Sequence, residues 1–232
     1  TEKLASMGTL SAGVAHEINN PLAIILGFAD LLLEKTPPDS ETHDILKTIE
    51  KQGLKAKGVV ESLLRFARAE EQKRIDVDIN KNIEEVLTVA GNNLLLNKIA
   101  INKMELAESL PEVKGDPDEL HQVFLNIINN AVYVMKGGGV LTIATRAINN
   151  GRDVEIRIAD TGYGIDKKYR SRIFDPLFTT KEVGEGTGLG LSVSYGIVKK
   201  HGGTIAFETK TKEESEDTGT TFIITLPAIK IG

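Results

Sequence analysis

Two glycine-rich stretches decide the fold of this chain: Asp160-Thr161-Gly162-Tyr163-Gly164 and Gly186-Thr187-Gly188-Leu189-Gly190-Leu191. The first ends an apolar strand pattern, so its carboxylate can accept from an adenine amine and its glycines admit a base. The second opens a helical pattern, whose free N–H groups and dipole favour phosphate. The residues before it are polar and no Gly-Lys-Ser/Thr string occurs, which argues against a dinucleotide fingerprint and a Walker loop. The two stretches predict a nucleotide pocket of another kind.

One histidine far upstream lies in a helical pattern, within Val14-Ala15-His16-Glu17-Ile18-Asn19-Asn20-Pro21. His16 falls between apolar positions, so its ring is expected to face water, where neutral imidazole is a nucleophile at physiological pH. Glu17 would hold one ring N–H and free the other nitrogen to attack. Asn20 lies one turn on and would position a water molecule. The alternative is that these polar residues only form a solvated helix face.

A second helical pattern, over residues 116–135, carries two asparagines four residues apart. Asn126 and Asn130 therefore share one helix face. Amide oxygens suit Mg²⁺, which keeps several waters and takes further ligands from substrate phosphates. Asparagine is mildly unfavourable inside a helix, so the pair predicts a binding role. The alternative is two amides that face solvent.

Composition and charge narrow the class of protein. The chain has 232 residues, which fit one large domain or two small ones. Its net charge of −5 argues against nucleic-acid binding, and the absence of cysteine excludes disulfides and thiolate metal sites. No apolar run approaches the ~20 residues that span a bilayer. We expect a cytoplasmic fragment without membrane contact, preceded by an input region because it starts in mid-pattern; membrane attachment of the full-length protein stays open.

The N-terminal third predicts a helical hairpin. Apolar residues recur at spacings of three, four or seven over residues 4–32 and again over residues 45–66, with a turn at residues 36–40 between them. An isolated hairpin buries such stripes poorly, so we expect two copies to form a four-helix bundle as a homodimer. Gly53 and Gly58 either loosen the hairpin for bending or admit a close partner, or they are simply tolerated inside a packed bundle. The polar residues 68–74 form the expected linker.

The remainder predicts an α+β fold. Helical patterns cover residues 80–95, with Asn80 as the N-cap, residues 116–135 and residues 189–200. Alternation indicates strands at residues 75–79, 140–147, 154–159, 204–209 and 220–226. The turn Asn149-Asn150-Gly151 joins the second of these strands to the third. Mixed helices and hairpin-linked strands imply an α/β sandwich, one sheet covered by helices.

In their order along the chain, these segments resemble the catalytic core of the two-component sensor histidine kinases. Residues 16–21 resemble that family's H box, residues 126–131 its N box, and the two glycine stretches its glycine boxes. Residues 173–181 resemble its F box, and their Phe-Thr-Thr-Lys ending is similar to the nitrogen-regulation-like branch. The resemblance implies a dimerisation and histidine-phosphotransfer hairpin, residues 1–71, followed by a Bergerat-type ATP-binding domain, residues 75–232.

The resemblance also implies roles for single residues. His16 would be the phosphoacceptor, Glu17 its general base, and Asn20 an aid to phosphatase action. Asn126 and Asn130 would serve Mg²⁺ and the phosphates of ATP. The expected nucleotide-binding residues are Asn126, Asn130, Tyr133, Asp160, Gly162, Gly164, Ile165, Lys181, Gly186, Thr187, Gly188, Leu189, Gly190 and Leu191.

Tyr133 departs from the family pattern. Many members carry a basic residue there, so that phosphate contact is lost or passes to Lys136 or Lys181. A mobile ATP lid is expected over residues 169–186.

The implied reaction transfers the ATP γ-phosphoryl group to His16 and then to an aspartate of a response-regulator receiver domain, which the same core would also dephosphorylate. One alternative is an ATPase of the same nucleotide-binding fold, with Glu119 as its acidic residue. The other is a dimeric scaffold that binds nucleotide and partner without phosphorylating itself.

Overall fold

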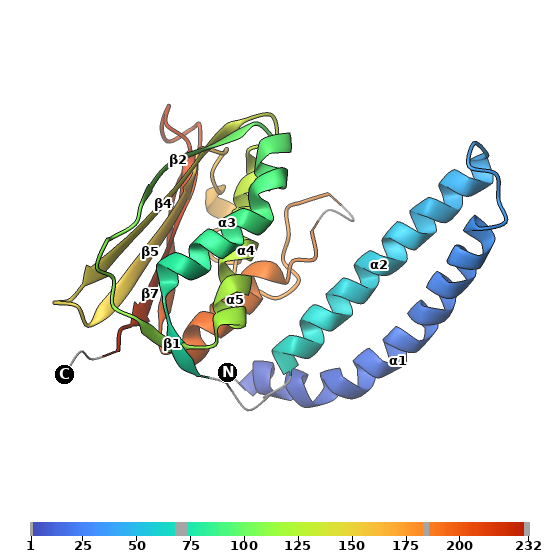
Figure 1. Cartoon of the computed structure of the whole chain (residues 1–232), viewed down its shortest axis with the longest axis horizontal. Helices are drawn as coiled ribbons and strands as arrows, with labels where there is room; N and C mark the ends of the chain where they lie inside the picture. The colour runs from blue at the N-terminus through green and yellow to red at the C-terminus, as the bar shows by residue number, and fades with distance from the viewer. Residues whose placement is uncertain (1, 68–73, 183–185, 230–232) are drawn as a thin grey trace. The chain divides into compact units, whose positions relative to one another are not determined.

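The computed structural model describes residues 2–67, 74–182 and 186–229, while the side chains of residues 2–16, 55, 59, 61–67 and 102–104 lie outside that description. It divides into two compact units, drawn in Figure 1: residues 1–71 with residues 179–189, and residues 72–178 with residues 190–232. None of the described helices carries an apolar stretch of the length needed to cross a membrane.

The first unit contains the expected helical hairpin, α1 (Glu2–Leu33) and α2 (Glu41–Ala67). Small residues line the contact between its two helices. Ala29 is buried there, and Gly53 leaves room for Leu26, since a Cβ at residue 53 would lie 2.7 Å from Leu26 Cδ2. Phe28 and Leu32, on the predicted stripe, are instead 62% and 51% exposed. Much of the apolar surface of α1 thus remains uncovered within one chain.

The second unit confirms the expected α+β class. Among the described residues, its main sheet has the order β2-β4-β5-β7-β6, in which β2 and β4 are parallel and the other pairs antiparallel. The helices cover one face of this sheet (Figure 1). The strands and helices are β1 (Ile75–Val77), α3 (Ile79–Leu96), β2 (Ile99–Glu105), β3 (Val113–Gly115), α4 (Pro117–Val134), β4 (Gly139–Ile148), β5 (Asp153–Asp160), the 3₁₀ helix η1 (Lys167–Tyr169), α5 (Gly190–Lys200), β6 (Thr204–Lys210) and β7 (Gly219–Pro227).

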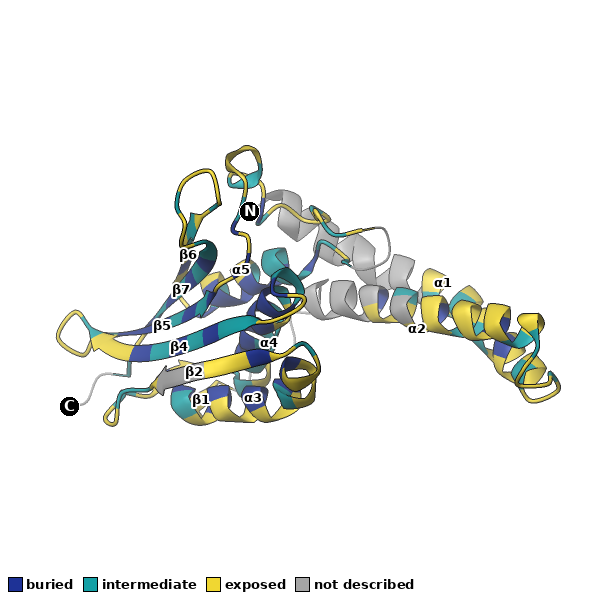
Figure 2. Cartoon of the chain, turned by 90° about the horizontal axis from the view of Figure 1, so that it is seen from above, coloured by how far each residue is buried: buried dark blue, intermediate teal, exposed yellow. Residues whose placement is uncertain are grey.

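The core of this unit lies between the sheet and the helices. Strand β4 alternates buried with partly exposed residues, as Figure 2 shows, because its two faces meet different surroundings. Ile156 and Ile158 of β5 and Phe124 and Ile128 of α4 are at most 1% exposed. Full burial of such a side chain contributes about 1.5–3 kcal/mol, so this layer fixes where α4 sits on the sheet.

Two sequence predictions in this unit were wrong. The first strand ends at Val77 rather than residue 79, because the Asp78 side chain accepts from Lys81 N at 3.1 Å and caps α3. The predicted cap, Asn80, instead donates to Ala107 O and accepts from Thr145 Oγ1.

Strands β2 and β3 were missed. Strand β3 has only three residues, too few to show alternation, and the polar second half of β2 hides its pattern. Strand β2 nevertheless joins the sheet because it pairs in parallel with β4, a contact between segments far apart in the sequence.

Candidate functional site

Asp160 is a buried carboxylate at the end of β5. The residue is 9% exposed, and its Oδ1 accepts from Gly162 N at 2.9 Å and from Thr220 N at 3.2 Å. Burial raises the pKa of Asp160 to about 6, although the two backbone donors oppose that rise. Both donors reach Oδ1, so Oδ2 is the oxygen that can accept from an amine of a ligand.

The glycines around Asp160 are required by close packing of the protein itself. Gly164 has a φ of 75°, and a Cβ there would collide with Lys210 O. Gly219 has a φ of 146°, and a Cβ there would collide with Asp160 O. Glycine is the residue that tolerates both demands, so the first glycine stretch is seated directly on the ends of β6 and β7.

Two threonines that the sequence reasoning missed connect these segments. Thr209 Oγ1 accepts from Ile165 N at 2.8 Å and lies 3.0 Å from both Gly219 O and Thr220 Oγ1. Threonines in strands are ordinary residues with high β-propensity, so the local sequence offered no signal for a role at the site.

Asn126 connects α4 to the first turn of α5. Its Nδ2 donates to Gly190 O at 3.1 Å and to Ser194 Oγ at 3.3 Å, so the amide nitrogen is engaged within the protein. Asn130 lies one turn further along the same helix. No group of three or more His, Cys, Asp or Glu side chains able to hold a metal occurs among the described residues. Independently of that finding, amide oxygens such as those of Asn126 and Asn130 are of the kind that Mg²⁺ accepts, since this ion takes its remaining ligands from phosphates and water.

The second glycine stretch leads into α5. Gly188 has a φ of 67°, Leu189 N donates to Thr187 Oγ1 at 3.3 Å, and the helix begins at Gly190, so Leu191 falls in its first turn. Just upstream, Lys181 N donates to Thr179 Oγ1 at 3.1 Å. A Cβ on Gly186 would lie 2.8 Å from Lys181 Cδ, so the two residues are close neighbours.

An aromatic and basic cluster lies near Asp160. Lys136 Nζ lies 4.3 Å from the centre of the Tyr133 ring. The pKa of Tyr163 is raised by partial burial and further by Tyr133 and Asp160, whereas Lys136 lowers it. Lys136 thus lies beside Tyr133. Tyr133 is the position at which many members of the resembled family carry a basic residue, and Lys136 is one of the two lysines predicted to replace it.

The remaining predicted residues lie on α1. Glu17 and Asn20 are exposed, and the side chain of His16 lies outside the described residues. Glu119, the acidic residue of the ATPase alternative, accepts from Lys200 Nζ at 2.6 Å in an ion pair between α4 and the end of α5.

Comparison with known families places both parts of the chain. Residues 115–230 match the family of histidine kinase-, DNA gyrase B-, and HSP90-like ATPases, and residues 6–72 match the His Kinase A (phospho-acceptor) domain. The sensor histidine kinase ZraS of Escherichia coli K12 is 37% identical over 226 residues, which are 97% of this chain and 46% of that protein. The chain thus spans less than half the length of this relative.

Two solved structures resemble the chain over nearly its whole length. Full-length ShkA in complex with AMPPNP has a TM-score of 0.79 at 27% identity, covering 97% of this chain and 46% of ShkA. The histidine kinase ThkA in complex with the response regulator TrrA has a TM-score of 0.69 at 25% identity, covering 98% of this chain and 64% of ThkA. The chain therefore belongs to the histidine kinase-, DNA gyrase B-, and HSP90-like ATPases and, with its His Kinase A segment, is the catalytic core of a two-component histidine kinase.

Proposed function

We propose that this chain transfers the γ-phosphoryl group of ATP to His16 and then to an aspartate of a response-regulator receiver domain. The observation that carries the proposal is the joint presence of a buried acceptor, Asp160, and of Asn126, an α4 residue that donates to the first turn of α5. Both lie in a chain whose preceding segment matches a phospho-acceptor domain. The AMPPNP bound to ShkA and the regulator bound to ThkA support the two proposed partners.

In the proposed pocket, Asp160 Oδ2 accepts from the exocyclic amine of adenine. The free N–H groups at the start of α5, around Gly190 and Leu191, face the phosphates. The amide oxygens of Asn126 and Asn130 hold Mg²⁺, which when bound neutralises charge on the transferring phosphoryl group. Tyr133, Lys136 and Lys181 are further proposed contacts.

At the proposed phosphoacceptor, one ring nitrogen of neutral His16 forms a bond to the γ-phosphorus. The bond from that phosphorus to the β–γ bridging oxygen breaks, and ADP leaves with the electron pair. The Glu17 carboxylate accepts a hydrogen bond from the N–H of the other ring nitrogen and so stabilises the positive charge that develops on the ring. Asn20 would position the water that later hydrolyses the phosphoaspartate of the regulator.

We extend the proposal to the domain organisation and the oligomeric state of the chain. Residues 1–71 act as the dimerisation and phosphotransfer domain and residues 75–232 as the ATP-binding domain, in a homodimer joined through the exposed apolar residues of α1. The absence of cysteine fits a reducing cytoplasm. The assignment to the nitrogen-regulation-like branch stays a prediction, as does the mobile lid.

The ATPase alternative is weakened by the contact that Glu119 makes. The Glu119 carboxylate forms an ion pair with Lys200. Glu119 lies seven residues before Asn126, which is about two turns away along α4. A carboxylate engaged there is poorly placed to activate water at the phosphates.

The test is labelling of the purified chain with Mg²⁺ and γ-labelled ATP. The parent chain should take up label that is acid-labile and base-stable, as expected of phosphohistidine. His16→Gln should abolish that label while ATP still binds. His43→Gln, a change at another histidine of the hairpin, should leave labelling unaltered. Released phosphate without label would favour the ATPase, and neither label nor release would favour the scaffold.

A further inference from the structure

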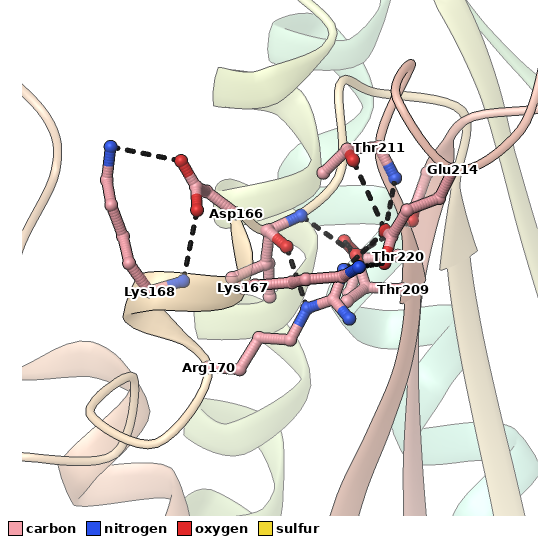
Figure 3. A network of polar contacts seen from close by, with 10 residues as sticks. Asp166, Lys167, Lys168, Arg170, Thr209, Thr211, Glu214 and Thr220 are labelled. Carbon is pink, nitrogen blue, oxygen red and sulfur yellow. Dashed lines mark hydrogen bonds and ion pairs between the residues drawn. The ribbon is translucent and has the colours of Figure 1, made fainter.

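Arg170, directly after η1, forms an ion pair with Glu214 in the loop between β6 and β7, as Figure 3 shows. The Glu214 carboxylate also accepts from Thr211 N at 3.1 Å and from Thr211 Oγ1 at 3.2 Å, and lies 3.5 Å from Lys167 Nζ. The hydrogen bonds from Arg170, which act most strongly, and from Thr211 lower the pKa of Glu214 to about 2. The carboxylate is therefore ionised at any pH at which the protein would work.

The guanidinium of Arg170 has a second partner. Its Nε donates to Ile165 O at 2.9 Å, while Nη2 reaches Glu214. One planar group thus connects the β6–β7 loop to the backbone that follows the first glycine stretch. A lysine ammonium cannot reproduce this fixed fork.

Hydrogen bonds continue from Ile165 to the candidate adenine-binding carboxylate. Ile165 N donates to Thr209 Oγ1, Thr209 contacts Thr220, and Thr220 N donates to Asp160 Oδ1. Ile165 is therefore held on both sides, at its carbonyl by Arg170 and at its amide by Thr209. The path from Glu214 to Asp160 is contiguous.

Contacts also hold the residues that follow Arg170. The ring of Phe178 lies 5.7 Å from Tyr169 and 4.7 Å from the guanidinium of Arg172, measured to ring centres. Phe174 lies 5.5 Å from Tyr195 of α5, also between ring centres. Of these contacts, the one between Phe174 and Tyr195 joins the first half of the expected lid to α5, while the other two lie within that half.

We propose that Arg170 and Glu214 are positioning residues for nucleotide binding, which hold the Gly164–Ile165 backbone and, through Thr209 and Thr220, the Asp160 carboxylate in register with the base. The inference rests on the proposed function, because it presupposes ATP in this pocket. Arg170 and Glu214 are both partly exposed, so their pairing contributes little to global stability. Its loss acts on nucleotide affinity rather than on the melting temperature.

The test compares ATP dissociation constants, measured by calorimetry, for the parent chain, Glu214→Ala, Arg170→Lys and Glu216→Ala. Glu216 is an exposed carboxylate on the same loop and serves as the matched control. Glu214→Ala and Arg170→Lys should weaken ATP binding by roughly three- to tenfold, the range that corresponds to the net contribution of a typical hydrogen bond. They should also raise the KM for ATP in autophosphorylation with little change in kcat or melting temperature, whereas Glu216→Ala should match the parent.

A charge-swapped double variant, Arg170→Glu with Glu214→Arg, distinguishes two effects. One is the positioning of the Ile165 backbone by Arg170, and the other is the attraction between the two charged side chains. The swap restores an ion pair but leaves Ile165 O without its donor, so ATP affinity should remain weak. Recovery of affinity in the swap would overturn the positioning role, as would unaltered affinity in Glu214→Ala and Arg170→Lys. Failure of the parent chain to bind ATP would instead overturn the proposed function itself, and this inference with it.

Discussion

Asp160 is buried, and burial disfavours the charged form of its carboxyl group. Its pKa is about 6 in the folded chain and near 3.8 in the unfolded chain, so the folded state binds the proton more tightly. The contribution of Asp160 to stability is therefore most favourable below about pH 4 and is lost as pH rises through about 6. Two pKa units correspond to about 3 kcal/mol at pH 7. Asp160→Asn retains an oxygen for Gly162 and Thr220 but carries no charge, so we expect up to about 3 kcal/mol more stability in urea denaturation at pH 7 without nucleotide.

The same variant should show little gain in stability below about pH 4, where the parent carboxyl is neutral in both states. Asp160→Asn should also lose ATP binding, because an amide is a weaker acceptor for the adenine amine. A variant less stable than the parent at pH 7 would contradict the assigned cost of burying this charge.

Helix α2 contains two glycines whose surroundings differ. Gly53 is buried against Leu26, and a Cβ there would lie 2.7 Å from Leu26 Cδ2, whereas a Cβ on the exposed Gly58 would meet nothing within 4 Å. Alanine is favoured over glycine in a helix by up to about 1 kcal/mol. Gly58→Ala should therefore raise the melting temperature followed by far-UV circular dichroism. Gly53→Ala should lower it, because Leu26 must move.

The pair also tests whether Gly53 admits a close partner or is simply tolerated in the helix. If Gly53 admits the close approach of α1, its substitution alters stability, while phosphotransfer at Gly58→Ala stays as in the parent. Equal stabilisation by both substitutions would show that Gly53 is simply tolerated.

The hairpin leaves an apolar face of α1 uncovered, so the assembled protein is expected to be a dimer. Ile25, Phe28 and Leu32 are exposed at spacings of three and four, which place them on one side of the helix. Phe28→Glu puts a charge into the proposed interface and should weaken self-association by more than about tenfold, measured by sedimentation equilibrium.

Leu54 provides the matched control for that experiment. Leu54 is 54% exposed, comparable to Phe28. It lies nine residues from Ile45, an exposed residue of the apolar stripe predicted for residues 45–66. At about 100° per residue it therefore faces roughly the opposite side of α2. Leu54→Glu should leave the dimer intact, and a Phe28→Glu chain that still sediments as a dimer would rule out the proposed interface.

The site could be predicted from sequence only in part. The positions of Asp160 at a strand end and of Asn126 on a helix face follow from local periodicity, while their binding roles stay predictions. Thr209, Thr220, Arg170 and Glu214 could not be found, since each acts through residues that the sheet brings close from far along the chain. The cap of α3 was also missed, because Asp78 and Asn80 are both good cap residues and tertiary contacts of Asn80 decide between them.

The amino-acid sequence alone determined the helical hairpin, the longer strands, the α+β class and the order of the family motifs, because these depend on periodicity and turn chemistry within short windows. The tertiary structure decided what depends on distance in space. It set the parallel pairing of β2 with β4, turned the amide nitrogen of Asn126 toward Gly190, and joined Asp160 to Glu214 through two threonines. Burial, which raises the pKa of Asp160, and hydrogen bonds between distant segments exist only once the chain has folded.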